Sequence, residues 1–257
     1  MNYTQINIKN RVAYLTLNRP EKRNALNHEF VSELRQAFEQ LRNDDKVKVV
    51  IINAEGKAFC AGADLAYIQQ LQANSYEENL EDSNHLKALF HSIYTFPKVV
   101  IAQIQGHAIA GGCGLATVCD FSYTVPDAKF GYTEVKIGFI PAIVKVFLLR
   151  KIGEGKAKEL LLSGQLYTAE QAVAMGLINK MVPADELEKH VFDFAQTLVT
   201  NNSGQSMQFT KQMIAAVQEK SLEDGLDYAA SQNAKARNSA DCKKGIAAFL
   251  NKETPEW

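Results

Sequence analysis

The sequence has little proline, few cysteines, no long apolar run and no excess of either charge. Its 257 residues include only 6 prolines and 15 glycines, which excludes collagen-like and low-complexity classes. Lys and Arg number 28 against 29 Asp and Glu, so the chain has no overall field to attract a nucleic acid or an anionic membrane. The longest apolar stretch, IGFIPAIVKVFLL, is too short to span a bilayer and contains Lys145. We therefore expect no nucleic-acid partner and no membrane segment.

The cysteines and histidines lack the spacing of a metal site or a disulfide framework. No CxxC pair occurs, and no histidine lies at zinc-finger spacing from a cysteine. The first ten residues, MNYTQINIKN, lack the apolar segment of a signal peptide. These features predict a cytoplasmic protein without a metal, in which the cysteines are small buried hydrophobes.

Strand-like and helix-like segments alternate in the first half of the chain. Residues 12–17 suit a strand, residues 25–45 carry one apolar stripe at helical spacing, and residues 47–54 form a β-branched run typical of a buried strand. A second buried strand is expected within residues 98–106, and two short strands within residues 121–132. Strands that alternate with helices predict an α/β protein built from a recurring unit of paired strands and a helix.

The second half is mainly helical. One helix is expected to end at Gly164, and Thr168 with Gln171 forms a capping-box pattern at the start of the next. From Pro183 to Leu250 we expect three or four amphipathic helices, with breaks at 202–204, near Gly225 and near Ser239. The chain is therefore divided into a core, residues 1–195, and a C-terminal helical region, residues 196–257.

Two glycine-rich segments are the first candidates for a functional site. Residues 57–66, GKAFCAGADL, predict a loop that leads into a helix, and residues 106–114, GHAIAGGCG, lie between a buried strand and a helix. The second segment does not fit the GxGxxG pattern of a dinucleotide site, and Gly153–Lys156 lacks the residues of a P-loop. Two such helix starts can direct two backbone N–H groups at one oxygen, which is the design of an oxyanion hole.

A site of this kind also needs a group that carries protons. Glu134 lies in FGYTEVKIGFIP, with Phe130, Ile137, Phe139 and Ile140 nearby. Burial among these side chains would raise the pKa of Glu134 toward the range useful for acid–base catalysis. A capped or solvated surface glutamate is the alternative.

Five motifs, in this order, resemble those of the enoyl-CoA hydratase/isomerase, or crotonase, superfamily. They are NRPEKRNALN, FCAGADL, GHAIAGGCGLATVCD, AKFGYTEVKIGFIP and AAFLNKETPEW, and the resemblance covers essentially the whole chain. It implies a spiral of strand–strand–helix turns followed by a helical trimerisation region, and thus a homotrimer or a dimer of trimers. It also implies an acyl-CoA substrate, no separate cofactor, and a role in fatty acid metabolism or leucine degradation.

The resemblance also assigns roles to individual residues. The N–H groups of Ala63 and Gly111 would hold the thioester oxygen, with Glu134 as the acid–base residue. Phe249 and Lys252 would contact the CoA nucleotide from a neighbouring subunit. The remaining CoA-binding candidates are Arg23, Ala25, Ala61, Asp64, Leu65 and Gly112.

One departure from the family pattern bears on the reaction. Typical hydratases carry two catalytic glutamates, and Gly114 stands where the first would be. GGCGLA followed by TEVKIGFIPAIV is most similar to bacterial methylglutaconyl-CoA hydratase-like members, which implies hydration of a short or branched enoyl-CoA. A single-glutamate Δ3,Δ2-enoyl-CoA isomerase and a non-catalytic acyl-CoA-binding scaffold are the alternatives.

The identity of a second acid–base group stays open. Tyr67, Tyr132 and His107 are its candidates. If the site only lacks a second carboxylate, Gly114→Glu should increase hydration of crotonyl-CoA.

Overall fold

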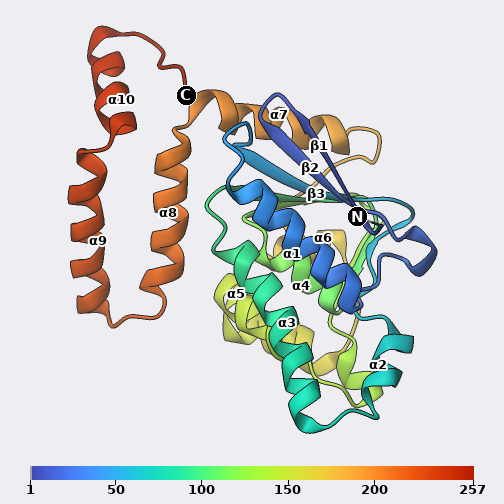
Figure 1. The fold of residues 1–257 in the computed structure, drawn as a ribbon. Helices are drawn as coiled ribbons and strands as arrows, with labels where there is room; N and C mark the ends of the chain where they lie inside the picture. Colours follow the sequence, from blue (N-terminus) through green and yellow to red (C-terminus); the bar gives the residue numbers. More distant parts are fainter. Residues whose placement is uncertain (1) are drawn as a thin grey trace.

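The computed structural model describes residues 2–257 as two sheets wrapped by helices, with a helical arm at the C-terminal end (Figure 1). The strands are β1 (Thr4–Lys9), β2 (Val12–Leu17), β3 (Val49–Ala54), β4 (Ala58–Cys60), β5 (Val99–Ile104), β6 (His107–Ile109), β7 (Phe121–Thr124), β8 (Lys129–Gly131), β9 (Tyr167–Thr168) and β10 (Lys180–Met181). The helices are α1 (His28–Arg42), α2 (Leu65–Leu71), α3 (Tyr76–Tyr94), α4 (Gly111–Val118), α5 (Ala142–Ser163), α6 (Ala169–Ala174), α7 (Leu187–Asn201), α8 (Gly204–Val217), α9 (Leu222–Arg237) and α10 (Ala240–Asn251), with 3-10 turns η1 (Pro20–Lys22) and η2 (Glu134–Ile137).

The chain winds as a spiral that adds one strand to each of two sheets in every turn. One sheet has the order β1-β2-β3-β5-β7-β10 and the other the order β4-β6-β8-β9. The pairs β3–β5 and β5–β7 are parallel, and so are β4–β6 and β6–β8. Because β4, β6 and β8 run in parallel, the loops that follow them meet at one edge of the second sheet. The predicted spiral of strand–strand–helix turns is confirmed.

The predicted core segments form the elements expected from their apolar patterns. All six residues of β5 are buried, as are the first four of β3, which fits strands covered on both faces. Helix α1 buries the stripe predicted for residues 25–45, and Asn27 caps it by accepting a hydrogen bond from the Phe30 N–H. The capping box at Thr168 and Gln171 is present, and Gly164 ends α5 with φ +60°.

Two local predictions were wrong. Residues 57–66 contain the short strand β4 as well as a loop. Three residues are enough for this strand because it pairs with β6 in the parallel part of the second sheet. Gly225 lies inside α9 and does not break it. The break precedes Ser221, whose side chain caps α9 by accepting from the Asp224 N–H.

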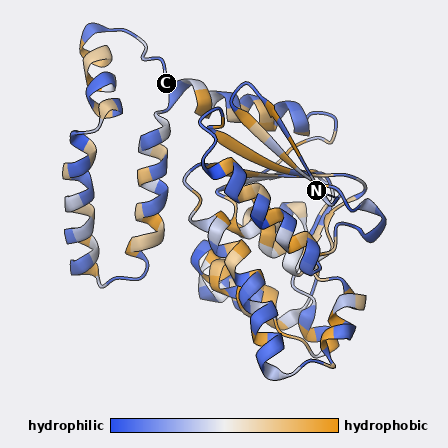
Figure 2. Ribbon diagram, viewed as in Figure 1, coloured by the Kyte–Doolittle hydropathy of each residue, from blue (hydrophilic) through white to orange (hydrophobic). Residues whose placement is uncertain are grey.

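Helices α8, α9 and α10 form an arm that extends away from the sheets (Figure 1). Apolar and polar residues alternate along its helices (Figure 2), and several large apolar side chains on it are exposed. Residue 195, the boundary expected from sequence, lies inside α7, which packs on the first sheet; the arm begins after Asn201. The most exposed apolar residues of the arm are Ile214, Leu222, Leu226, Ile246, Phe249 and Leu250.

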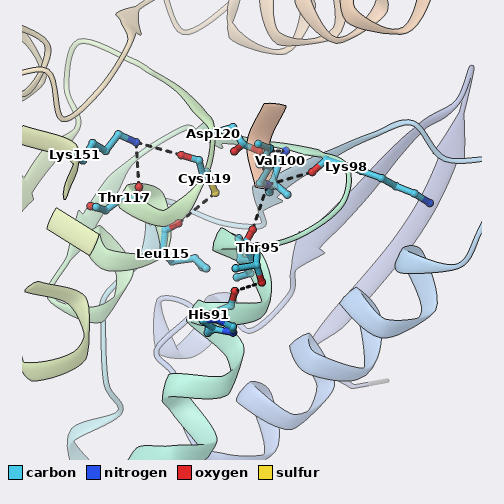
Figure 3. A network of polar contacts seen from close by, with 11 residues as sticks. His91, Thr95, Lys98, Val100, Leu115, Thr117, Cys119, Asp120 and Lys151 are labelled. Carbon is cyan, nitrogen blue, oxygen red and sulfur yellow. Dashed lines mark hydrogen bonds and ion pairs between the residues drawn. The ribbon is translucent and has the colours of Figure 1, made fainter. Parts of the chain in front are cut away.

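A polar network at the C-terminal end of α4 anchors both this helix and the arm. The Lys151 Nζ donates to the carbonyl oxygens of Thr117 (3.1 Å) and Cys119 (3.3 Å), which end α4 (Figure 3). From α8, the Lys211 Nζ reaches into the core and binds the Asp120 carboxylate at 2.6 Å. The Asp120 carboxylate also accepts from the Val100 N–H at 2.7 Å. A cation at a helix C-terminus stabilises that helix, so the network fixes α4 from the end opposite to Gly111.

Candidate functional site

The loops that follow β4 and β6 touch each other. A Cβ atom placed on Gly111 would lie 3.7 Å from the Gly62 Cα and 4.0 Å from the Ala63 N. A Cβ atom on Gly62 would lie 3.2 Å from the Gly111 N and only 2.9 Å from the Ile109 O. Gly62 also has φ +89°, which favours glycine. The absence of side chains at both positions thus allows the two predicted N–H donors to come together.

Both donor groups are free for a ligand. Within residues 2–257, neither the Ala63 N–H nor the Gly111 N–H has a hydrogen-bond acceptor. The neighbouring groups are occupied: the Leu26 N–H donates to the Gly62 O at 2.7 Å, and the Asp64 N–H donates to the Leu26 O at 2.8 Å. Gly111 is also the first residue of α4, where the helix dipole favours negative charge. Two adjacent N–H groups of this kind can stabilise an oxyanion.

A buried ion pair holds the first loop in place. The Arg19 NH1 lies 2.8 Å from the Asp64 Oδ2, with both side chains about nine-tenths buried. Asp64 also caps α2 by accepting from the Ala66 N–H at 3.0 Å. Burial alone would raise the pKa of Asp64, but these partners lower it overall. Asp64 therefore positions the loop next to Ala63, and its predicted contact with CoA stays a prediction.

Asn24 supports the same loop, and the sequence analysis assigned it no role. Asn24 is fully buried with φ +55°, and its Nδ2 donates to the carbonyl oxygens of Glu55 (2.9 Å) and Ala58 (3.0 Å). The Arg19 NH1 also donates to the Ala25 O at 2.8 Å. The polar spacing of NRPEKRNALN was the available signal, because asparagine tolerates a positive φ and bonds to backbone.

The other predicted CoA-binding residues fall into two groups. Arg23 and Leu65 are exposed next to this loop, and Ala61 is half-buried, with its N–H donating to the Arg23 O at 3.0 Å. Ala25 and Gly112 are buried. A Cβ atom on Gly112 would lie 2.1 Å from the Cys60 O. This glycine lets α4 approach β4, and its predicted contact with CoA stays a prediction.

Glu134 lies on the segment that follows β8, the strand paired with β6. It begins η2, three residues after Gly131, which pairs with Ile109 and accepts from the Ala110 N–H at 2.7 Å. Burial raises the pKa of the Glu134 carboxyl, and its Oε2 is buried without a hydrogen-bond partner among residues 2–257. Burial raises the pKa of the Cys113 thiol to about 12, and the charge of Glu134 adds a smaller contribution. The Glu134 carboxylate therefore lies near Cys113, which is in the first turn of α4.

Of the four apolar neighbours expected around Glu134, only Phe130 is fully buried. Ile137, Phe139 and Ile140 are 65%, 48% and 62% exposed. Residues 134–137 form a 3-10 turn that ends at Gly138 with φ +73°, and the last two of these exposed side chains follow that turn.

Gly114 is enclosed by the core. A Cβ atom there would lie 2.2 Å from the Val144 Cγ1 and 3.1 Å from the Phe90 Cε1. Val144 of α5 fills the volume that a glutamate side chain would need, so the packing disfavours a second carboxylate at position 114.

The three candidates for a second acid–base group have other partners. The Tyr132 hydroxyl is fully buried and shares a 2.9 Å hydrogen bond with the Thr117 hydroxyl. The Tyr67 hydroxyl donates to the Asp82 carboxylate, and the His107 Nδ1 accepts from the Lys129 N–H at 3.2 Å. Among the four acid–base candidates, Glu134 is the one with a buried side-chain oxygen that has no hydrogen-bond partner within residues 2–257.

Phe249 and Lys252 lie far from these residues within one copy of the chain. Helix α10, which ends at Asn251, is on the side of the molecule opposite to α2 (Figure 1). Phe249 is 82% exposed. The predicted contacts with CoA therefore require a second copy, as the resemblance implies.

Other candidate sites give no competing chemistry. In the part of the chain from residue 2 onward, no group of three or more His, Cys, Asp or Glu could hold a metal ion. No helix in residues 2–257 is long and apolar enough to cross a membrane. A cleft of about 860 Å³ lies between the arm and the end of α4, lined in part by Asp120, Lys151 and Lys211. None of the predicted site residues lines it.

Comparison with known proteins gives matches along the whole chain. The family model described as enoyl-CoA hydratase/isomerase matches residues 7–257. A Thermus thermophilus protein, whose name gives enoyl-CoA hydratase as a provisional assignment, is 43% identical over 97% of this chain and 98% of its own. The 2,3-dehydroadipyl-CoA hydratase of Escherichia coli is 32% identical over 96% of this chain and 95% of its own.

Solved structures agree with these relatives. An enoyl-CoA hydratase from Shewanella pealeana has a TM-score of 0.93 at 29% identity, covering 99% of this chain and 96% of its own.

Proposed function

The chain belongs to the enoyl-CoA hydratase/isomerase family, and we propose that it is an enoyl-CoA hydratase. It adds water reversibly across the 2,3 double bond of a short or branched enoyl-CoA and needs no separate cofactor, because coenzyme A is part of the substrate. The observation that supports the proposal is the pair of unoccupied N–H groups, Ala63 and Gly111, together with the half-buried carboxylate of Glu134 on the segment after the neighbouring strand β8. Such an arrangement serves reactions that build negative charge on a carbonyl oxygen.

The mechanism follows from these three groups. The thioester oxygen binds between the two N–H groups, and the Glu134 carboxylate removes a proton from water as the water oxygen attacks the β-carbon. The charge passes to the thioester oxygen as an enolate, where each donor contributes about 3 kcal/mol. The protonated Glu134, or a water, then returns a proton to the α-carbon. The raised pKa of Glu134 suits it to both steps.

Within this function we propose a branched or carboxylated acyl group of the 3-methylglutaconyl type. Gly114 and the segment TEVKIGFIPAIV support this choice through their resemblance to methylglutaconyl-CoA hydratase-like members. The relative named for 2,3-dehydroadipyl-CoA also acts on a carboxylated acyl chain. A relative from Syntrophomonas wolfei, 34% identical, is named for crotonyl-CoA, so short unbranched substrates are the comparison in the assay.

Gly114 also favours a second candidate, a Δ3,Δ2-enoyl-CoA isomerase. A hydratase with two carboxylates can activate water with one and protonate carbon with the other, and Val144 leaves no room for a carboxylate at position 114. A single Glu134 is enough to move a proton between the α- and γ-carbons without water.

Turnover in ¹⁸O-labelled water separates the two reactions. The protein is incubated with 3-methylglutaconyl-CoA, crotonyl-CoA and 3-hexenoyl-CoA, and the products are examined by mass spectrometry. We expect label in the product of 3-methylglutaconyl-CoA. Unlabelled 2-hexenoyl-CoA, with no turnover of the other two substrates, would overturn the hydratase and leave the isomerase.

Replacing Glu134 by glutamine tests its role as the base. The glutamine keeps the shape of the side chain but cannot accept a proton, so kcat should fall by roughly 10²–10⁴ with little change in substrate affinity. In the wild type, the rate should fall as the pH falls through the raised pKa of Glu134, above its ordinary value of 4.5. Full activity of the glutamine variant would contradict both mechanisms, and an acyl-CoA-binding scaffold would bind but not turn over any substrate.

We further propose that the site is completed by a second copy of the chain in a homotrimer or a dimer of trimers. The exposed apolar residues of the arm and of η2 support this, since a lone chain leaves both surfaces uncovered. Phe249 and Lys252 of one copy would then contact the CoA nucleotide held by another, with the lysine as a point charge for phosphate.

A further inference from the structure

Ala110, the residue before the Gly111 donor, has a backbone conformation that alanine rarely adopts. Its φ of +52° and ψ of −125° match the first central position of a type II′ turn, which is dominated by glycine. Arg23 and Lys252 also have positive φ, but both lie in the ordinary left-handed region. Ala110 is thus held in a conformation that its side chain opposes.

Two hydrogen bonds and one packing contact hold Ala110 in place. Its N–H donates to the Gly131 O at 2.7 Å, and its carbonyl accepts from the Gly114 N–H at 3.0 Å. Its methyl group faces the other loop, because a Cβ atom on Gly62 would lie only 2.7 Å from the Ala110 Cβ. The strained residue is therefore linked to β8, to the first turn of α4, and to the residue before Ala63.

The conformation of Ala110 sets the direction of the Gly111 N–H. This N–H lies in the planar peptide group that joins residues 110 and 111, so rotation about ψ of Ala110 turns the donor. Gly62 has the same relation to the Ala63 N–H. The methyl of Ala110 lies against Gly62 and so fixes the two peptide groups relative to each other.

We propose that Ala110 is a positioning residue for the oxyanion hole, and that its methyl contact with Gly62 keeps both N–H groups directed at one oxygen. The inference rests on the proposed function of the same site. A glycine at position 110 would relieve the strain but allow the donor peptide to rotate. The glycine variant should then lose activity without losing thermal stability, whereas replacing a purely structural residue would lower both.

The test compares Ala110→Gly with Ala110→Ser, which keeps the Cβ atom. For Ala110→Gly we expect kcat to fall by about 10-fold, part of the 10²–10³ lost with a whole donor, with KM nearly unchanged. The midpoint of thermal unfolding should stay equal or rise, because glycine adopts the positive φ without strain. The serine variant should keep most of the activity. Ala128→Gly, in a turn outside the site and without a positive φ, is the control for a change from alanine to glycine.

A readout that needs no turnover separates this inference from the proposed function. Acetoacetyl-CoA ionises to an enolate whose ultraviolet absorbance measures its fraction in the bound state, and two aligned donors favour the enolate. Ala110→Gly should raise the pKa of the bound ligand by about 1, the equivalent of a tenfold loss, while Ala110→Ser should not. An unchanged enolate fraction, or a clear loss of thermal stability in the glycine variant, would overturn the inference. A wild type that forms the enolate but hydrates no enoyl-CoA would overturn the proposed function alone.

Discussion

Gly114 shows how one missing side chain limits the chemistry of the site. Its Cα faces Val144 of α5 and Phe90 of α3 so closely that even a methyl group would overlap them. The residue is fully enclosed in the first turns of α4, between Cys113 and Leu115, which are buried as well. The lack of a carboxylate at this position is therefore built into the packing of α4 against α5.

Adding a side chain at position 114 should destabilise the fold and fail to increase hydration. We expect Gly114→Ala to lower the free energy of unfolding by about 1–3 kcal/mol through overpacking, and Gly114→Glu to lower it further by burying a carboxylate. Denaturant unfolding and the hydration rate of crotonyl-CoA measure the two effects. Combining Gly114→Ala with Val144→Ala should recover part of the stability. A stable Gly114→Glu variant with faster crotonyl-CoA hydration would show that α5 moves aside.

At the scale of elements, Lys211 links the arm to the core. It projects from α8 and is itself buried, with its Nζ on the Asp120 carboxylate at 2.6 Å and near the carbonyl oxygens of Ile93 and Lys98. Burial raises the pKa of Asp120, although Lys211 opposes this change. The same Asp120 follows α4, so the position of the arm and the end of the helix that carries Gly111 depend on one ion pair.

Removing both partners of this pair should cost less than the sum of removing each one alone. Lys211→Met leaves the partly buried Asp120 without its cation, and we expect the free energy of unfolding to fall by about 3 kcal/mol. Lys211→Met combined with Asp120→Asn should lose less than the sum of the single changes. Equilibrium unfolding of the wild type, the two single variants and the double variant at neutral pH measures the coupling. Additive losses would show that the two side chains contribute to stability independently of each other.

At the scale of the whole molecule, the arm presents apolar side chains that the chain itself does not cover. Leu222, Phe249 and Leu250 are 82%, 82% and 74% exposed, which is unusual for large apolar residues clustered on one module. The apolar residues that follow Glu134 are exposed as well. These two surfaces, on opposite sides of one copy, suit contacts between different copies of the chain.

We therefore expect sedimentation at micromolar concentration to give three or six times the 28.5 kDa mass of the chain. Lys252→Ala should weaken binding of full CoA thioesters but leave pantetheine thioesters nearly unaffected, because only the former carry the nucleotide phosphates. A stable monomer would contradict the assembly. An equal loss for both thioesters would show that Lys252 acts through the fold.

The amino-acid sequence alone predicts the main strands and helices of the core and the two segments that carry the N–H donors. Apolar runs such as residues 47–54 and the stripe of α1 predict strands and helices because local periodicity decides which faces are buried. The glycines before Ala63 and around Gly111 are enough to predict an oxyanion hole, and the family motifs point to Glu134. These features depend on neighbours in sequence or on ordered motifs.

Which residues share a surface and which fill the core is seen only in the packing of the folded chain. The contact of Gly62 with Ala110, the enclosure of Gly114 by Val144, and the ion pair of Lys211 with Asp120 each join segments far apart in the chain. The same is true of the exposure of Ile137, Phe139 and Ile140, which lie in and after a 3-10 turn that ends at a left-handed Gly138. Periodicity cannot encode such contacts, because they arise when successive turns of the spiral stack and their packing selects one partner among many.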